Sequence, residues 1–480
     1  MSKVNLKKNL IYNILYQMIG MIIPLITSPY LSRVLGAKNL GIQSYTLSIS
    51  VYFSMFVLLG IGNYGNRTIA KVLNSDVKNV EKSFWGIYCI QFFMGLILSI
   101  SYIFYVLFFV NKYTNIAFIQ IFCILTNMFD ITWFFYGKED FKLIVFRNTF
   151  VKVLGLVLIF VLVKNENDLV VYSLINSLVG LLSQLIMWKQ LYEAVKFVKI
   201  TILDIKKHIR GILILFIPVL AISVFTNMDK SMIGIYSTVS EVGYYDNANK
   251  IIEIPKSLIS ALGAVMLPRT AALLAQGNEK LSISYIEKTM IFTFFISSPL
   301  MFGLIAVSDY FSIIFWGKDF IVSGILIAIL SPAFLFSILG NIVRTQYLIP
   351  RARDKEYTYS LILGAIVNFI ININLIPIYG AYGAAIGTVA AEFLMSLIQI
   401  LFVERELPIF SYIKQGIVFL FIGLIMLVVI ELIKKILVVS FINLIILIVI
   451  GALIYISLSY FYIRLSTNKN INDLRQYIRR

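Results

Sequence analysis

Charged side chains that interrupt apolar stretches are the residues of this sequence with the clearest chemical potential. Four of them fall within an arc of about 120° when each residue advances a helix by about 100°. They are Asp246, Lys250, Glu253 and Lys256. The lysines could bind an anion, and the carboxylates could exchange protons or sodium ions. The alternative is structural pairing, of Asp246 with Lys250 and of Glu253 with a basic neighbour, because these spacings bring side chains together on a helix.

A second polar stripe, without charge, runs along residues 9–32. Its members are Asn9, Asn13, Tyr16, Gln17, Gly20, Pro24, Thr27 and Ser28. The prolines of this segment remove backbone donors, so the freed carbonyls need a cavity or neighbouring helices. We expect this stripe and the charged stripe to face each other across a central polar cavity.

Other charged residues lie within or beside apolar segments: Arg33, Arg67, Asp130, Arg147, Lys152, Asp229, Lys230, Arg344 and Glu392. Such charges cost several kcal/mol in a bilayer unless they face protein or water, so they mark candidate pathways. The excess of basic groups favours a substrate with an anionic end. The alternative for the four arginines is that they extend to the membrane interface.

Enzymatic and metal chemistry find little support in the residue types. Cys89 and Cys123 lie inside apolar segments and are expected to be packing residues, and the single histidine, His208, is expected to be a solvated loop residue. We expect no catalytic residues, no metal site and no cofactor. No G-x-x-x-x-G-K-[ST] loop occurs, so transport would draw on a proton or sodium gradient, or on the imbalance of the substrate itself.

The elements that must position these residues are membrane-spanning helices. The chain is 60% hydrophobic and 14% charged over 480 residues, which no water-soluble fold could bury. Apolar runs near twenty residues recur, each long enough to cross about 30 Å of hydrocarbon. We expect about fourteen spans, over residues 9–32, 41–65, 84–110, 113–136, 143–163, 168–190, 211–236, 246–268, 286–308, 320–345, 358–377, 381–402, 412–434 and 437–463.

The positive charges predict the orientation of these spans. Lys and Arg are retained on the cytoplasmic side, and the longest basic loops alternate with loops that hold few basic residues. Both termini are therefore expected in the cytoplasm, with the protein in the cell membrane. Because Lys and Arg punctuate span ends, the net charge of +17 does not indicate nucleic-acid binding.

The connection at residues 191–210 has apolar residues at helical intervals with basic residues between them. We expect it to be an amphipathic helix on the cytoplasmic membrane surface that links two halves. The predicted organisation is an N-terminal lobe at 1–190, this linker, a C-terminal lobe at 211–405, and two further spans with a tail at 406–480.

Several short motifs resemble those of bacterial polysaccharide repeat-unit flippases, from the first span to the twelfth and in the same order. They are 29–36 (PYLSRVLG), 133–141 (WFFYGKEDF), 229–234 (DKSMIG), 241–245 (EVGYY), 265–269 (VMLPR) and 376–385 (IPIYGAYGAA). One departure is Tyr136, where relatives usually have Gln.

The resemblance implies the fold of the multidrug/oligosaccharidyl-lipid/polysaccharide exporter superfamily: an all-α polytopic protein with two six-helix lobes in a V around a central cavity, plus two C-terminal helices. It implies translocation of undecaprenyl-pyrophosphate-linked oligosaccharide to the outer leaflet by alternating access, for O-antigen, capsule or another surface glycan. Polymerase and chain-length proteins are the implied partners besides the bilayer.

Specific roles follow for the candidate residues if the substrate is of this kind. Arg33, Lys230, Lys250 and Lys256 would attract the pyrophosphate. Asn13, Tyr16, Gln17 and Thr27 would line the sugar path, and Asp229, Asp246 or Glu253 would couple an ion. The alternatives are a drug or metabolite exporter of the same superfamily, a flippase for the peptidoglycan precursor, and a membrane-embedded glycan polymerase.

Overall fold

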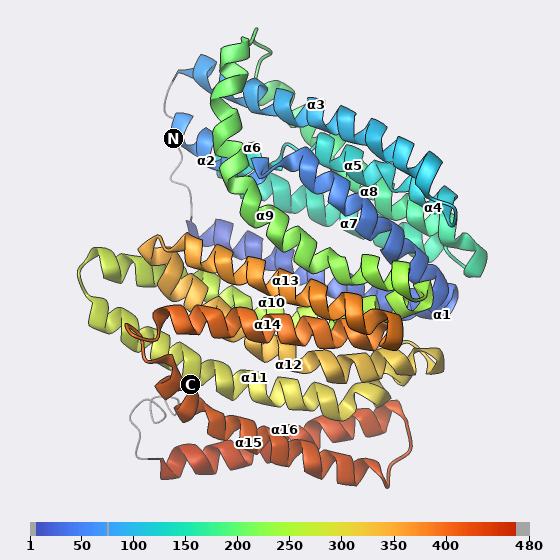
Figure 1. Ribbon diagram of the computed structural model, residues 1–480, viewed down its shortest axis with the longest axis vertical. Helices are drawn as coiled ribbons and strands as arrows, with labels where there is room; N and C mark the ends of the chain where they lie inside the picture. The colour runs from blue at the N-terminus through green and yellow to red at the C-terminus, as the bar shows by residue number, and fades with distance from the viewer. Residues whose placement is uncertain (1–5, 74–75, 467–480) are drawn as a thin grey trace. The chain divides into compact units, whose positions relative to one another are not determined.

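The computed structural model describes residues 6–73 and 76–466, apart from the side chains of 6–19, 21, 258, 261, 262, 264 and 265. These residues form helices joined by short loops, as the apolar spans predicted, and no strand occurs among them. The chain forms two compact units, unit 1 (residues 1–235) and unit 2 (residues 236–480), and each is described by itself (Figure 1).

Unit 1 contains the first nine helices. They are α1 (Leu6–Leu58), α2 (Ile61–Val72), α3 (Val77–Phe109), α4 (Thr114–Ile119), α5 (Ile121–Met128), α6 (Thr132–Gly137), α7 (Phe141–Leu162), α8 (Leu169–Ala194) and α9 (Ile202–Tyr236). α1 turns at Gly36, whose φ of 73° lies in the region that favours glycine. The spans predicted over 9–32 and 41–65 are therefore two helical parts joined by this corner.

The span predicted over 113–136 is broken between α5 and α6. Gln91 on α3 donates its amide hydrogens to the carbonyls of Asn127 and Asp130, each at 2.7 Å, and its own carbonyl accepts from Trp133 Nε1 at 3.1 Å. Asp130 accepts from the backbone N–H of Thr132 at 2.8 Å and so begins α6. One buried amide thus satisfies two of the carbonyls that the break releases, and Trp188 Nε1 donates to a third, that of Phe129.

The described part of unit 2 contains seven long helices. They are α10 (Val239–Ala275), α11 (Glu279–Phe315), α12 (Ile321–Val343), α13 (Asp354–Tyr379), α14 (Ala381–Val403), α15 (Ile409–Lys434) and α16 (Phe441–Leu465). α10, α11 and α12 pack on one another, α12 and α13 both pack on α14, and the hairpin of α15 and α16 packs on α11 (Figure 1).

Twelve segments in the described parts of the chain are long and apolar enough to cross a membrane. One of them, Ile22–Val72, includes the corner at Gly36 and covers two predicted spans. α10 is not among the twelve and carries the charged stripe. Counting both parts of the first segment, and α10, agrees with the prediction of about fourteen spanning helices.

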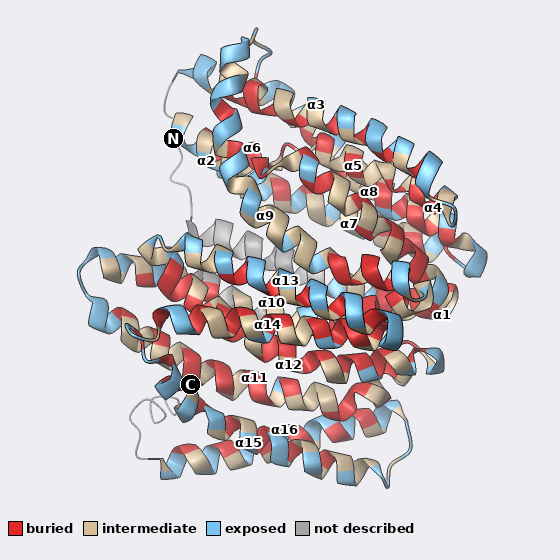
Figure 2. Ribbon diagram, viewed as in Figure 1, coloured by how far each residue is buried: buried red, intermediate tan, exposed pale blue. Residues whose placement is uncertain are grey.

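Burial follows the pattern of a membrane protein. Figure 2 shows much of α11, α12 and α14 buried, whereas the outward faces of α15 and α16 are exposed or intermediate. Large apolar side chains also remain exposed on α3, among them Phe104 (55%) and Phe108 (66%). Faces of this kind are stable against lipid tails but not against water.

The segment at 191–210 differs from the predicted surface helix. α8 continues to Ala194, residues 195–201 are largely extended, and α9 begins at Ile202. Val195 is buried, because the extended segment packs onto unit 1. The boundary between the compact units falls after Ile235, later than the predicted linker, because α9 packs on unit 1 through Gly211 and Gly234, which contact Tyr64 and Tyr45.

Candidate functional site

α10 and α14 are joined by polar contacts along their length. Near the start of α10, Glu241 Oε2 accepts a hydrogen bond from Ala381 N at 2.7 Å, at the first turn of α14. One turn later, the Tyr245 hydroxyl lies 2.9 Å from that of Thr388. Because the partners advance in the same direction along both helices, α10 and α14 run parallel, as two even-numbered spans should.

Lys256 lies at the far end of this series, between two carboxylates. Its Nζ is 2.9 Å from Glu392 Oε1 on α14 and 3.1 Å from Glu253 Oε1 on its own helix. The Glu392 side chain is 8% exposed, that of Lys256 is 25% exposed, and that of Glu253 is 51% exposed. The group therefore has one firmly held carboxylate and one that reaches solvent or a ligand.

Lys250 also has a carboxylate partner on the polar face of α10. Its Nζ lies 2.6 Å from Asp246 Oδ2, and the Asp246 side chain is 8% exposed. The two lysines of the charged stripe are thus engaged by the pairings that helical spacing allows. Together the five groups carry two positive and three negative charges, so an anion competes with a carboxylate for either ammonium.

The candidate residues on α1 lie in unit 1. Thr27 is buried and donates its hydroxyl hydrogen to Ile23 O at 3.0 Å, within its own helix. Arg33 is exposed, one turn before the corner at Gly36. The side chains of Asn13, Tyr16 and Gln17 lie outside the described residues, so their role in a sugar path stays a prediction.

The Asp229-Lys230 pair lies on α9, and Asp229 is buried whereas Lys230 is intermediate. The next residue, Ser231, lies 3.0 Å from the Tyr52 hydroxyl on α1, so this part of α9 is held to unit 1. The candidate residues therefore divide between unit 1 and unit 2. Their convergence on one cavity stays a prediction.

Lys152 on α7 is a cation that the sequence could not assign to a site. A methyl group added at Gly20 would lie 3.3 Å from Lys152 Nζ, so this ammonium lies against the polar stripe of α1. The sequence offered two signals: a lysine in the middle of an apolar span, and a glycine on the polar face of another predicted helix. We add Lys152 to the candidate site of unit 1.

Two sequence-based interpretations are wrong. His208 is not a solvated loop residue: it is 3% exposed on α9, its Nδ1 lies 2.9 Å from the Tyr64 hydroxyl, and Gly86 on α3 leaves room for its ring. Arg147 does not extend to the interface: it is 4% exposed and donates to Ser183 O at 2.9 Å. Both polar groups are buried because neighbouring helices supply hydrogen-bond partners.

At one end of unit 2, an ion network joins the start of α13 to the loop between α14 and α15. Arg353 Nη1 lies 2.8 Å from Glu406 Oε2, and the Tyr347 hydroxyl donates to the same carboxylate at 2.5 Å. The hydrogen bond from Tyr347, together with the guanidinium of Arg353, lowers the pKa of Glu406 below its usual range. This network ties the connection between α12 and α13 to the connection between α14 and α15.

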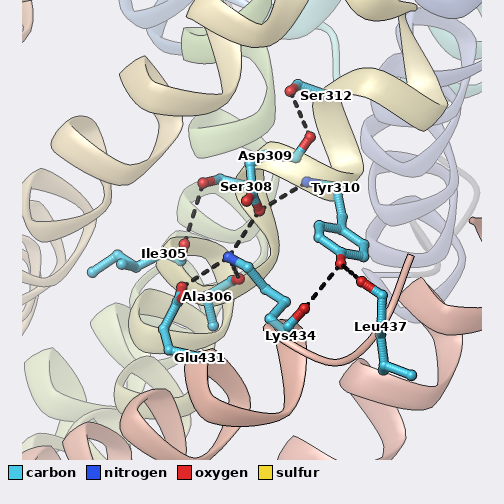
Figure 3. Close-up of polar contacts among 9 residues, drawn as sticks. All are labelled: Ile305, Ala306, Ser308, Asp309, Tyr310, Ser312, Glu431, Lys434 and Leu437. Atoms are coloured by element: carbon cyan, nitrogen blue, oxygen red, sulfur yellow. Dashed lines mark hydrogen bonds and ion pairs between the residues drawn. The ribbon is translucent and has the colours of Figure 1, made fainter. Parts of the chain in front are cut away.

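A second network fastens the C-terminal hairpin at the other end of unit 2 (Figure 3). Lys434 Nζ on α15 lies 3.0 Å from Asp309 Oδ1 and donates to Ala306 O at 2.8 Å, both on α11. The Tyr310 hydroxyl donates to Leu437 O at 2.5 Å, just beyond the end of α15. Since its ammonium is already neutralised and its side chain is 12% exposed, Lys434 is a structural residue.

Solved structures of membrane transporters share this fold. A lipid II flippase MurJ in an inward closed conformation aligns with a TM-score of 0.77, at 17% identity over 94% of this chain and 99% of the other. An inward-facing multidrug resistance MATE family transporter aligns with a TM-score of 0.59, at 13% identity over 83% and 96%. Both likenesses show that this chain has the multi-pass helical fold of these membrane transporters.

The sequence identifies the family. Residues 6–274 match the family described as polysaccharide biosynthesis protein, and this chain belongs to that family. A protein of Escherichia coli (strain K12) described as an O-antigen transporter is 24% identical over 410 residues, which cover 84% of this chain and 98% of the relative.

Proposed function

We propose that this protein translocates lipid-linked oligosaccharide repeat units across the membrane, for the assembly of a surface polysaccharide. The membership of the polysaccharide biosynthesis family is the observation that carries this proposal. The relative described as an O-antigen transporter and the fold shared with a lipid II flippase support the same substrate class. The substrate would be an undecaprenyl-pyrophosphate-linked oligosaccharide, moved from the cytoplasmic to the outer leaflet by alternating access.

The charges of unit 2 suggest how a pyrophosphate would be taken up. Lys256 holds Glu392 firmly, whereas Glu253 is half exposed and only three residues away on the same helix. A pyrophosphate brings more charge and more acceptor oxygens than one carboxylate, so it would displace Glu253 from Lys256. The released Glu253 would then take up a proton or a sodium ion, which couples substrate binding to an ion gradient.

The remaining candidate residues would bind other parts of the substrate, or an ion. Lys250 would exchange Asp246 for the second phosphate, and Arg33 and Lys230 would attract the pyrophosphate from unit 1. Asp229 would be a further site for an ion. The polar stripe of α1 would offer hydroxyl and amide groups to the sugars.

The double variant Lys250→Gln/Lys256→Gln tests the proposal. We expect loss of the surface glycan and accumulation of the lipid-linked oligosaccharide on the inner leaflet, when variant and wild type are compared at equal protein abundance. The matched control is Lys112→Gln/Lys435→Gln, which removes two exposed lysines outside the polar face. Full glycan in the first variant, or equal loss in both, would overturn the assignment of these lysines.

The same assay separates the alternatives. A glycan polymerase would leave single repeat units in the outer leaflet when it is absent, whereas a flippase leaves them in the inner leaflet. A drug exporter of the same superfamily would leave the glycan intact and lower the efflux of amphiphilic cations. A flippase for the peptidoglycan precursor would cause lysis when depleted.

A further inference from the structure

A cavity of about 510 Å³ lies at one end of unit 1. Trp85 of α3, Trp188 and Tyr192 of α8, and Lys196 and Phe197 of the extended segment line it. Its volume is within the roughly 300–1,000 Å³ of pockets that hold small ligands. Nothing in the proposed transport step uses this cavity.

Hydrogen bonds fix the walls of the cavity before any ligand arrives. Trp85 Nε1 donates to Lys196 O at 3.0 Å, and Trp188 Nε1 donates to Phe129 O at 3.0 Å. Lys196 N in turn donates to Glu81 Oε1 at 3.1 Å. The polar edges of both indoles are therefore satisfied, and their apolar faces remain for a ligand.

The outer part of the cavity is aromatic and exposed. Tyr192 is 87% exposed and Phe197 is 78% exposed, and the ring of Phe197 lies edge-on to Trp85 at 5.1 Å between centroids. In a membrane protein, aromatic side chains of this kind at the end of a helix bundle lie at the level of the lipid headgroups.

Basic groups outnumber acidic ones around the cavity: Lys189, Lys196 and Lys199 lie near two carboxylates, Glu81 and Glu193. Within the described residues, no carboxylate pairs with the ammonium of Lys196, and Lys189 and Lys199 are exposed close to it in the chain. The basic loops predict that this end faces the cytoplasm, where the leaflet carries anionic lipids. An apolar cavity with a cationic rim matches an acyl chain joined to a phosphate.

We propose that this cavity binds one anionic phospholipid of the bilayer, with an acyl chain against Trp85 and Trp188 and the phosphate at Lys196. The site would anchor the extended segment between α8 and α9 to the leaflet. It is independent of the transported substrate, so the proposed function can fail without affecting it.

The tryptophans provide a direct test. The chain has four, and Trp133 and Trp316 are each 1% exposed, so contact quenching by brominated lipids reports on Trp85 and Trp188. The full chain is reconstituted in phosphatidylcholine nanodiscs with a small fixed share of either brominated phosphatidylglycerol or brominated phosphatidylcholine. We expect stronger quenching by the phosphatidylglycerol, and loss of this quenching in Trp85→Phe/Trp188→Phe.

Lys196→Gln should weaken the preference for phosphatidylglycerol roughly five-fold. It leaves the backbone hydrogen bonds of Lys196 in place, so folding should not change. Lys112→Gln removes an exposed lysine at the other end of unit 1 and should leave the preference as it is. Equal quenching by the two brominated lipids, or equal effects of the two lysine variants, would overturn the proposal.

Discussion

At the scale of residues, the two carboxylates on Lys256 should differ in their contribution to stability. Glu392→Gln removes the buried partner of the partly buried Lys256 ammonium and should lower the free energy of unfolding by about 1–3 kcal/mol. Glu253→Gln removes an exposed partner of Lys256, three residues away on the same helix, and should lower the free energy of unfolding by about 0–1 kcal/mol. Thermal unfolding of the purified protein measures both. A larger loss in Glu253→Gln would contradict this assignment of firm and displaceable partners.

The network at Glu406 predicts a pH dependence. The pKa of Glu406 is lowered in the folded protein, chiefly by the hydrogen bond from Tyr347. Its contribution to the free energy of unfolding is therefore present above the ordinary glutamate pKa of about 4.3, and it is lost as the pH falls through the lowered pKa. Wild type should therefore unfold at a higher temperature than Glu406→Gln at pH 7, and the difference should shrink at pH 3. A constant difference between pH 7 and pH 3 would contradict the ion pair.

The sequence predicted which residues share a helix face but not their partners on other helices. The pairing of Asp246 with Lys250 followed from a four-residue spacing, and the structure confirms it. The pairing of Lys256 with Glu392 spans 136 residues and depends on how α10 packs on α14. His208 was misjudged for the same reason, because the space left by Gly86 cannot be read from residues near His208.

At the scale of elements, the start of α14 depends on a contact between two of the sequence motifs. Gly380 has a φ of 54° and a ψ of −130°, and an added Cβ would collide with the Glu241 carboxylate that caps α14. Gly380→Ala should lower the free energy of unfolding by about 1–3 kcal/mol, because it imposes both backbone strain and this collision. Gly277→Ala is the control for strain alone, since its φ is 70° and its surroundings are open.

A comparable loss in the two glycine variants would show that strain, not the contact with Glu241, dominates at Gly380.

The helix positions themselves were predictable, since long apolar runs have no other stable form in a bilayer. The break between α5 and α6 was not, because the apolar run continues through it and the released carbonyls are satisfied by Gln91 and Trp188, which are far away in sequence.

At the scale of the whole molecule, the predicted orientation can be tested with single cysteines. The background is Cys89→Ser/Cys123→Ser, since these are the two natural cysteines. A thiol reagent that does not cross membranes should label Asn111→Cys on intact cells but not Asn278→Cys, and both after permeabilisation. Labelling of Asn278→Cys alone on intact cells would invert the predicted orientation.

The fold class and the approximate number of spans followed from composition, because apolar length and bilayer thickness leave few alternatives. The predicted division of the chain was less successful. The apolar periodicity of 191–210 indicated a surface helix, yet the segment is extended in part, because Trp85 and Glu81 bind its backbone. Periodicity describes one helix at a time and does not include hydrogen bonds offered by a neighbour.

The hairpin of α15 and α16 is fastened to the rest of unit 2 at several levels. At one end, contacts of Lys434 and Tyr310 join it to α11. Along its length, the Tyr455 hydroxyl donates to Phe295 O at 2.8 Å. At the other end, Glu406, just before α15, accepts a hydrogen bond from Arg353. The hairpin is therefore not free to move on its own, and it should move together with α11 in any conformational change. A fluorophore attached to this hairpin would therefore report on the motion of unit 2. It would do so at a distance from the charged face of α10.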